Sequence, residues 1–108
     1  MRIPRQFAAA LIGVAAALST AQALAQSSAA LHQRATAATC ANCHGTDGKS
    51  VSGSAVPSLA GMPKLYMVTQ MKAFRDGTRQ ATVMHQLAKG LTEQQIESVA
   101  DYFAALKP

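Results

Sequence analysis

Two cysteines and a histidine stand together in the stretch Cys40-Ala41-Asn42-Cys43-His44-Gly45. A C-x-x-C-H pattern is the attachment site of a c-type haem, because each thiol can form a thioether with one vinyl group of the porphyrin. The histidine that follows the second cysteine then lies beneath the ring plane, where its imidazole can bind the iron. The stretch therefore predicts one covalently bound haem c, attached through Cys40 and Cys43 and ligated by His44.

Three other interpretations of a C-x-x-C pair fit this chain less well. A dithiol redox motif is expected near a βαβ pattern, and the surrounding sequence has none. Half of a zinc site would need a second cysteine pair, whereas the chain has two cysteines in all. A disulfide between residues so close together would leave most of the chain without a crosslink. Haem attachment is the interpretation that we favour.

Residues 1–25 have the pattern of a secretory signal peptide. Two arginines precede an apolar stretch from Phe7 to Leu18, and Ala23-Leu24-Ala25 forms a small-x-small cleavage site. The apolar stretch is shorter than the ~20 residues of a transmembrane helix. The alternatives are an uncleaved membrane anchor and cleavage two residues earlier, after Ala21-Gln22-Ala23. The pattern predicts export to the periplasm, which agrees with the attachment of haem c outside the bacterial cytoplasm.

The mature chain, residues 26–108, has the length of one small domain. Aromatic residues make up 5% of the sequence and Trp is absent, so the core is small and needs a staple, which a covalent haem would provide. The basic residues are dispersed and no aromatic side chains alternate with them, which argues against nucleic-acid binding. No internal repeat is visible, so we expect a single haem in a monohaem domain.

An alanine-rich first helix is predicted for residues 28–39, which contain no Gly or Pro. One face of this helix holds Leu31, Ala35, Ala38 and Thr39. The next segment, residues 45–61, reads as a loop because Gly, Ser, Thr and Asp dominate it and Pro57 interrupts it. Long loops in compact domains are usually functional, and this one is expected to cover the haem edge on the His44 side.

A second helix is predicted to begin with Pro63 at its first position and to end at Asp76, with Gly77 as its C-cap. Its inward stripe holds Met67, Met71 and Phe74. A connection then leads to residues 84–90, a segment that has no clear periodicity and reads as a strap between two helices.

The last helix has the clearest start signal in the chain. Thr92 and Gln95 make a capping box, and Leu91 with Ile96 makes the matching hydrophobic staple. Its apolar face holds Ile96, Val99, Ala100, Phe103 and Leu106. The predicted fold class is therefore all-α, with the first and last helices crossing and the haem packed between them and the middle helix.

The second axial ligand decides what the haem does, because an open position binds ligands whereas a thioether closes the site and favours electron transfer. The candidates are Met62, Met67, Met71, Met84 and His85. Met67 and Met71 read as core residues of the middle helix, and Met62 precedes its first residue. Met84 lies in the strap between two helices, with His85 beside it as the rival ligand.

The chain resembles the class I c-type cytochromes over essentially all of its mature length. The resemblance rests on C-A-N-C-H-G-T-D-G-K-S, on P-S-L-A-G-M and on the helix Y-x-x-x-Q-M-K-x-F-R-x-G. It implies three main helices around one haem, with His44 as proximal and Met84 as distal iron ligand. It also implies that the carbonyl of Pro57 accepts a hydrogen bond from His44 and fixes the orientation of the imidazole.

Within that family, the segments A-T-V-M-H-Q-L-A-K-G-L and V-P-S-L-A-G-M are similar to the cytochrome subunit of flavocytochrome c sulfide dehydrogenase. This similarity implies a periplasmic electron-transfer protein that is no enzyme by itself. It implies a redox partner, an FAD-containing flavoprotein that oxidises sulfide. The alternatives are a freely diffusing monohaem cytochrome c and, in a different class, a haem protein with an open ligand-binding site.

Six basic residues lie between the haem motif and the last helix, where the haem rim is expected: Lys49, Lys64, Lys72, Arg75, Arg79 and Lys89. They are either an ordinary solvated surface or a docking face for an acidic partner.

Overall fold

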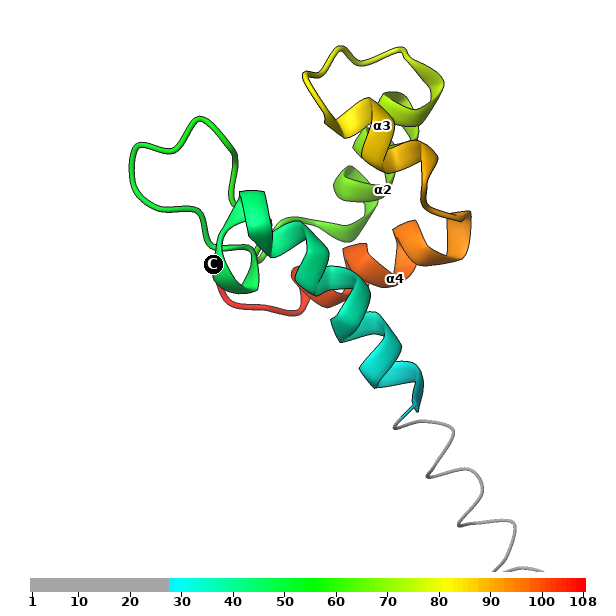
Figure 1. Ribbon diagram of the computed structural model, residues 1–108. Helices are drawn as coiled ribbons and strands as arrows, with labels where there is room; N and C mark the ends of the chain where they lie inside the picture. Colours follow the sequence, from blue (N-terminus) through cyan, green and yellow to red (C-terminus); the bar gives the residue numbers. More distant parts are fainter. Residues whose placement is uncertain (1–27) are drawn as a thin grey trace, which may run out of the picture. The chain divides into compact units, whose positions relative to one another are not determined.

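The computed structural model describes residues 28–108, and the predicted signal peptide, residues 1–25, lies outside this part of the chain. Gln33–Pro108 form one compact unit, whose fold is described below, and residues 28–32 are helical and belong to a separate unit. A helical segment over residues 28–44 is followed by a short 3₁₀ turn, η1 (Thr46–Gly48), and then by α2 (Lys64–Asp76), α3 (Met84–Lys89) and α4 (Glu93–Ala104) (Figure 1). Residues 28–108 contain no β-strand, so the prediction of an all-α fold is confirmed.

The first helix continues five residues beyond its predicted end at Thr39 and includes the whole C-x-x-C-H stretch. It ends after His44, where Gly45 takes a φ of 84° and donates its N–H to the carbonyl of Ala41 at 3.0 Å. The cysteines and the histidine therefore project from the last turns of one helix, which holds their relative directions.

The face that holds Leu31, Ala35, Ala38 and Thr39 is exposed. The buried residue of this helix is Ala37, which is 1% accessible to solvent, and Cys40 is partly buried one turn further on. Because alanine occupies many positions of this helix, the apolar pattern did not distinguish the buried face from the others.

Helix α2 begins one residue later than predicted, with Pro63 as its N-cap, and ends at Asp76 as predicted. Gly77 is the C-cap in the left-handed conformation, with a φ of 80°. Of the predicted inward stripe, Met67 is buried and Met71 packs against the core, whereas Phe74 is half-buried beneath the guanidinium of Arg79.

The prediction of a non-helical strap over residues 84–90 is wrong, because Met84–Lys89 form the helix α3. Six residues are too few for a helical period to be read from the sequence. Helix α3 packs against α2 and buries Ala88 completely, so tertiary contact supports it.

Helix α4 begins with the predicted capping box, in which the Thr92 side chain accepts the Gln95 N–H and the Gln95 side chain accepts the Thr92 N–H. The core joins the first helix, α2 and α4 through Ala37, Met67, Val68, Ile96, Ala100 and Phe103. Leu91, Val99 and Leu106 pack against it.

The segment 33–44 and α4 cross one another as predicted, and Gln33 Nε2 donates to the Ser98 carbonyl at 2.8 Å (Figure 1). In the part of the chain from residue 28 onward, no helix is both long and apolar enough to cross a membrane.

Candidate haem site

His44 is the last residue of the first helix. Among the described residues it is the buried polar residue, and 8% of its surface is exposed. Its Nδ1 lies 2.7 Å from the Pro57 carbonyl oxygen, so the predicted contact between these two residues is present. Because a carbonyl oxygen can only accept, Nδ1 carries the proton and donates it. The lone pair of the neutral ring is therefore on Nε2, the nitrogen that is left for a metal.

The two cysteines are free thiols in different surroundings. Cys40 is half-buried and packs against the core, whereas Cys43 is exposed. Burial raises the pKa of the Cys40 thiol, and a hydrogen bond with Thr39 opposes this shift. Two unpaired thiols beside an imidazole of defined tautomer are the donor set that covalent haem attachment requires, so the residues present fit the group.

The loop after His44 is closed at its neck by hydrogen bonds between residues 48–50 and 58–60. The carbonyl of Gly48 accepts the N–H groups of Leu59 at 2.7 Å and of Ala60 at 3.2 Å. The Ser50 N–H donates to Ser58 Oγ at 2.9 Å. The Ser50 Oγ donates to the His44 carbonyl at 3.1 Å, so the neck also contacts the histidine directly.

Sequence reasoning missed the two serines of this neck. Serines eight residues apart in a loop carry no periodic or capping signal, and their pairing depends on how the loop closes.

Met84 is the first residue of α3. It is half-buried and does not belong to the core, whereas Met62, Met67 and Met71 all lie in the core or pack against it. The three methionines of the core are therefore already used for packing. Among the methionines of residues 28–108, Met84 is the one that the core leaves available.

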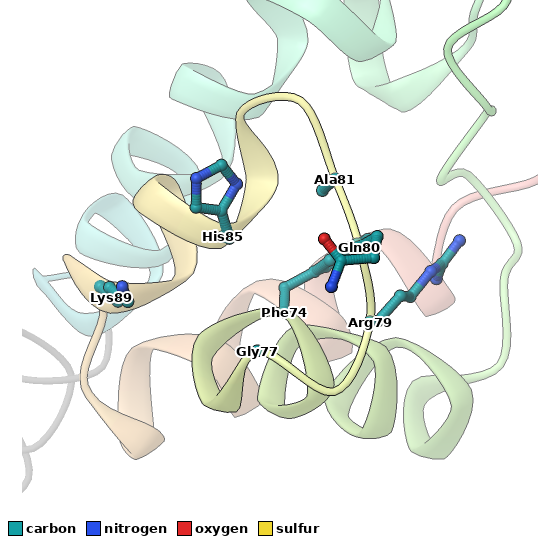
Figure 2. Close-up of a pocket in the computed structure, with 7 residues that line it drawn as sticks. All are labelled: Phe74, Gly77, Arg79, Gln80, Ala81, His85 and Lys89. Atoms are coloured by element: carbon teal, nitrogen blue, oxygen red, sulfur yellow. The ribbon is translucent and has the colours of Figure 1, made fainter.

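His85 follows Met84 and lines a cavity of about 140 Å³ between α2, α3 and the connection that joins them (Figure 2). Its Nδ1 is buried and has no hydrogen-bond partner in the protein. A buried ring nitrogen without a hydrogen-bond partner costs free energy, so His85 remains the alternative candidate to Met84 as an iron ligand. The Arg79 side chain extends away from His85 in this view, and its guanidinium lies 4.5 Å from the centre of the Phe74 ring.

Three of the six basic residues near the motif are paired with carboxylates. Lys64 Nζ lies 2.9 Å from Asp101 and 3.8 Å from Glu97, and Lys72 Nζ lies 2.7 Å from Glu93. Arg75 also contacts Glu93. These pairs join α2 to α4, so their charges are locally balanced and the idea of a continuous basic face is weakened.

A family model described as cytochrome c matches residues 29–107. The chain therefore belongs to the cytochrome c family, the class that carries haem c in covalent linkage and transfers electrons with it.

Three curated relatives show the range of the family to which the chain is similar. It is 40% identical over 72 residues to the thiosulfate dehydrogenase electron acceptor of Thiomonas intermedia, covering 67% of this chain and 33% of that protein. It is 45% identical over 67 residues to the cytochrome subunit of sulfide dehydrogenase of Chlorobaculum tepidum, covering 62% and 59%. It is 37% identical over 70 residues to cytochrome c-554(548) of Halomonas halodenitrificans, covering 62% and 83%.

Two solved structures have the same fold. Cytochrome c4 of Acidithiobacillus ferrooxidans is 40% identical with a TM-score of 0.58, covering 62% of this chain and 38% of that one. Thiosulfate dehydrogenase of Marichromatium purpuratum is 39% identical with a TM-score of 0.59, covering 64% and 15%. The chain thus spans between about a third and three fifths of the length of the first two curated relatives.

Proposed function

We propose that the chain transfers electrons in the periplasm through one haem c attached to Cys40 and Cys43, with His44 and Met84 as the iron ligands. It accepts these electrons from a sulfide-oxidising flavoprotein, of which it is the cytochrome subunit. The observation that carries the proposal is the 2.7 Å hydrogen bond from His44 Nδ1 to the Pro57 carbonyl, which leaves Nε2 to bind iron.

Each residue has a separate task in this proposal. Cys40 and Cys43 would hold the haem in place, and His44 would bind its iron through Nε2. The hydrogen bond from Nδ1–H to the Pro57 carbonyl makes Nε2 a stronger electron donor. Met84 would supply a thioether as the second protein ligand, which would exclude exogenous ligands and favour the ferrous state. When bound, the haem supplies one-electron redox chemistry. With His44 and Met84 both bound to the iron, the chain would act as an electron carrier without a catalytic centre of its own.

The proposed partner is supported by the names and identities of the relatives. One of them, 45% identical, is the cytochrome subunit of a sulfide dehydrogenase, and another is an electron acceptor of thiosulfate dehydrogenase. Both names refer to an enzyme that oxidises a reduced sulfur compound. We assign this chain to the sulfide dehydrogenase because its resemblance to the cytochrome subunit of that enzyme extends over the Met84 segment and the Pro57 segment.

The proposed location follows from the first 25 residues. Their removal as a signal peptide would leave residues 26–108 as a monohaem domain in the periplasm, where haem c is attached. N-terminal sequencing of the protein purified from the periplasmic fraction tests both points. The expected first residue is Gln26, or Leu24 if cleavage follows Ala23.

Acid–acetone extraction tests covalent attachment. The denatured wild-type protein should retain its haem, and its mass should exceed that of the polypeptide by one haem. The double variant Cys40→Ala, Cys43→Ala should lose the haem on extraction. Haem that extracts freely from the wild type contradicts the proposal.

Copurification tests the partner. The protein isolated from its source should carry a flavin-containing subunit, and sulfide should reduce the haem in that complex. Reduction by thiosulfate through a thiosulfate dehydrogenase, with no flavoprotein bound, would move the assignment to that enzyme.

A further inference from the structure

We propose that Ser50 and Ser58 are positioning residues for His44. Through two hydrogen bonds they hold the Pro57 carbonyl against the imidazole and so lower the reduction potential of the haem. This role depends on the proposed function, in which His44 is the proximal iron ligand.

The loop that follows His44 forms hydrogen bonds with both the ring and the backbone carbonyl of this residue. Its ring donates from Nδ1 to the Pro57 carbonyl at 2.7 Å, and its backbone carbonyl accepts the Ser50 hydroxyl at 3.1 Å. The Ser50 N–H donates in turn to Ser58 Oγ at 2.9 Å, and Ser58 follows Pro57 in the chain. These hydrogen bonds and the peptide bond between Pro57 and Ser58 form a closed ring of contacts. The separation of His44 and Pro57 therefore depends on the hydrogen bond between Ser50 and Ser58.

Pro57 needs such support because it has no N–H with which to anchor itself. The residues before it, 51–55, are all exposed. The hydrogen bonds that they make, from the Ser54 N–H to the Val51 carbonyl and from the Val56 N–H to Ser54 Oγ, are local to the loop tip. The anchor next to Pro57 in sequence is the Ser58 hydroxyl, followed by the Leu59 N–H on the Gly48 carbonyl.

The position of the Pro57 carbonyl has an electronic consequence for the iron ligand. A short hydrogen bond from Nδ1 makes the imidazole a stronger donor through Nε2, which stabilises the ferric state. If the loop neck loosens, this hydrogen bond lengthens, Nε2 donates less and the reduction potential rises. The serine pair therefore acts on the potential through His44 and Pro57.

Four variants of the holoprotein test this role. Ser50→Ala and Ser58→Ala should each shift the reduction potential upward, and Ser58→Thr, which keeps a hydroxyl, should restore the wild-type value. Ser54→Ala is the matched control, because Ser54 lies in the same loop and hydrogen-bonds only within the tip. NMR of the reduced protein should show the His44 ring N–H exchanging about fivefold faster in the two alanine variants of the neck, as expected for one lost hydrogen bond.

Unchanged potential and exchange rate in Ser50→Ala and Ser58→Ala would overturn the proposal, and so would equal shifts in Ser54→Ala. A lower melting temperature with an unchanged potential would also overturn it, since the serines would then only stabilise the fold. These outcomes do not bear on the covalent haem and the low-spin spectrum that the proposed function predicts for the wild type. Absence of those two properties in the wild type would contradict the proposed function instead.

Discussion

Gly48 lies against the ring of Phe103, so that a Cβ atom on Gly48 would come within 2.7 Å of both Cδ1 and Cε1 of that ring. Gly48 is buried with a φ of 73°, and its carbonyl accepts the two N–H groups that close the loop neck. Phe103 is 1% exposed and belongs to α4. The last helix is therefore packed directly against the loop that carries Pro57, although the two are far apart in sequence.

This contact predicts that Gly48→Ala strongly destabilises the protein. The left-handed backbone alone costs an alanine about 1–2 kcal/mol, and forcing a methyl group against a buried ring adds about 1–3 kcal/mol. Gly53→Ala is the matched control, because Gly53 has a φ of 80° and open space around it. Urea unfolding of the two holoproteins measures the difference. Equal losses would mean that the Phe103 ring can move aside at little cost.

Met84→Ala should change the iron site more than any other methionine substitution. We expect it to lose the weak ferric absorbance band of iron–sulfur ligation at the red end of the spectrum and to bind added cyanide rapidly. The reduction potential should fall, because a thioether stabilises the ferrous state.

The controls for this prediction are Met62→Ala and His85→Ala, which should both keep the band. Loss of the band in Met62→Ala would make that residue the ligand. If the wild-type spectrum lacks the band and His85→Ala changes the spectrum, the His85 imidazole is the iron ligand. A high-spin wild type would favour the alternative of an open haem site.

The ion pairs of Glu93 with Lys72 and Arg75 of α2 predict a pH dependence of stability. Hydrogen bonds from Lys72 and then Arg75 lower the pKa of the Glu93 carboxyl below its usual 4.5. Because this pKa is lower in the folded than in the unfolded chain, the contribution to stability is present above the usual value and lost as the pH falls through the lowered one.

The melting temperature of the wild type should therefore fall more between about pH 6 and pH 3 than that of Glu93→Gln. Glu97→Gln is the matched control on the same helix, since Glu97 reaches its partner Lys64 only at 3.8 Å. It should keep the pH dependence of the wild type. A parallel fall in all three proteins would show that Glu93 contributes nothing to acid stability.

Electron transfer from the proposed flavoprotein partner should depend weakly on salt. Lys64, Lys72 and Arg75 are balanced by carboxylates of α4, so these three charges contribute little to steering an acidic partner. A permanent subunit interface is also larger and more apolar than a transient one. Stopped-flow reduction at low and high ionic strength measures the dependence. A steep loss of rate with no stable complex would favour the freely diffusing carrier.

The features that were predictable from sequence rest on contacts between residues a few positions apart. The capping box of Thr92 and Gln95 and the left-handed C-cap at Gly77 are both present as expected, because each depends on local backbone geometry. The His44–Pro57 contact was also anticipated, through the family resemblance rather than through any local rule.

Other features needed the packed structure. Met84–Lys89 are helical because Ala88 is buried in the packed domain and α3 packs against α2, contacts that six residues of sequence do not disclose. The buried face of the first helix runs through Ala37 and not through the face of Leu31, because burial there depends on what packs against the helix. The pairing of Lys72 and Arg75 with Glu93 likewise depends on how α2 and α4 are aligned.

The sequence alone determined the chemistry. Two thiols and an imidazole at C-x-x-C-H spacing predict covalent haem attachment in any fold, because residues so few positions apart are always close together. Only the tertiary structure decided which contacts keep the Pro57 carbonyl against that imidazole. The tautomer of His44 depends on Pro57, and the place of Pro57 depends on Ser50, Ser58 and the Gly48–Phe103 contact. These contacts join segments that are separated by a flexible chain in the unfolded state, so packing of the whole domain is needed to bring them together.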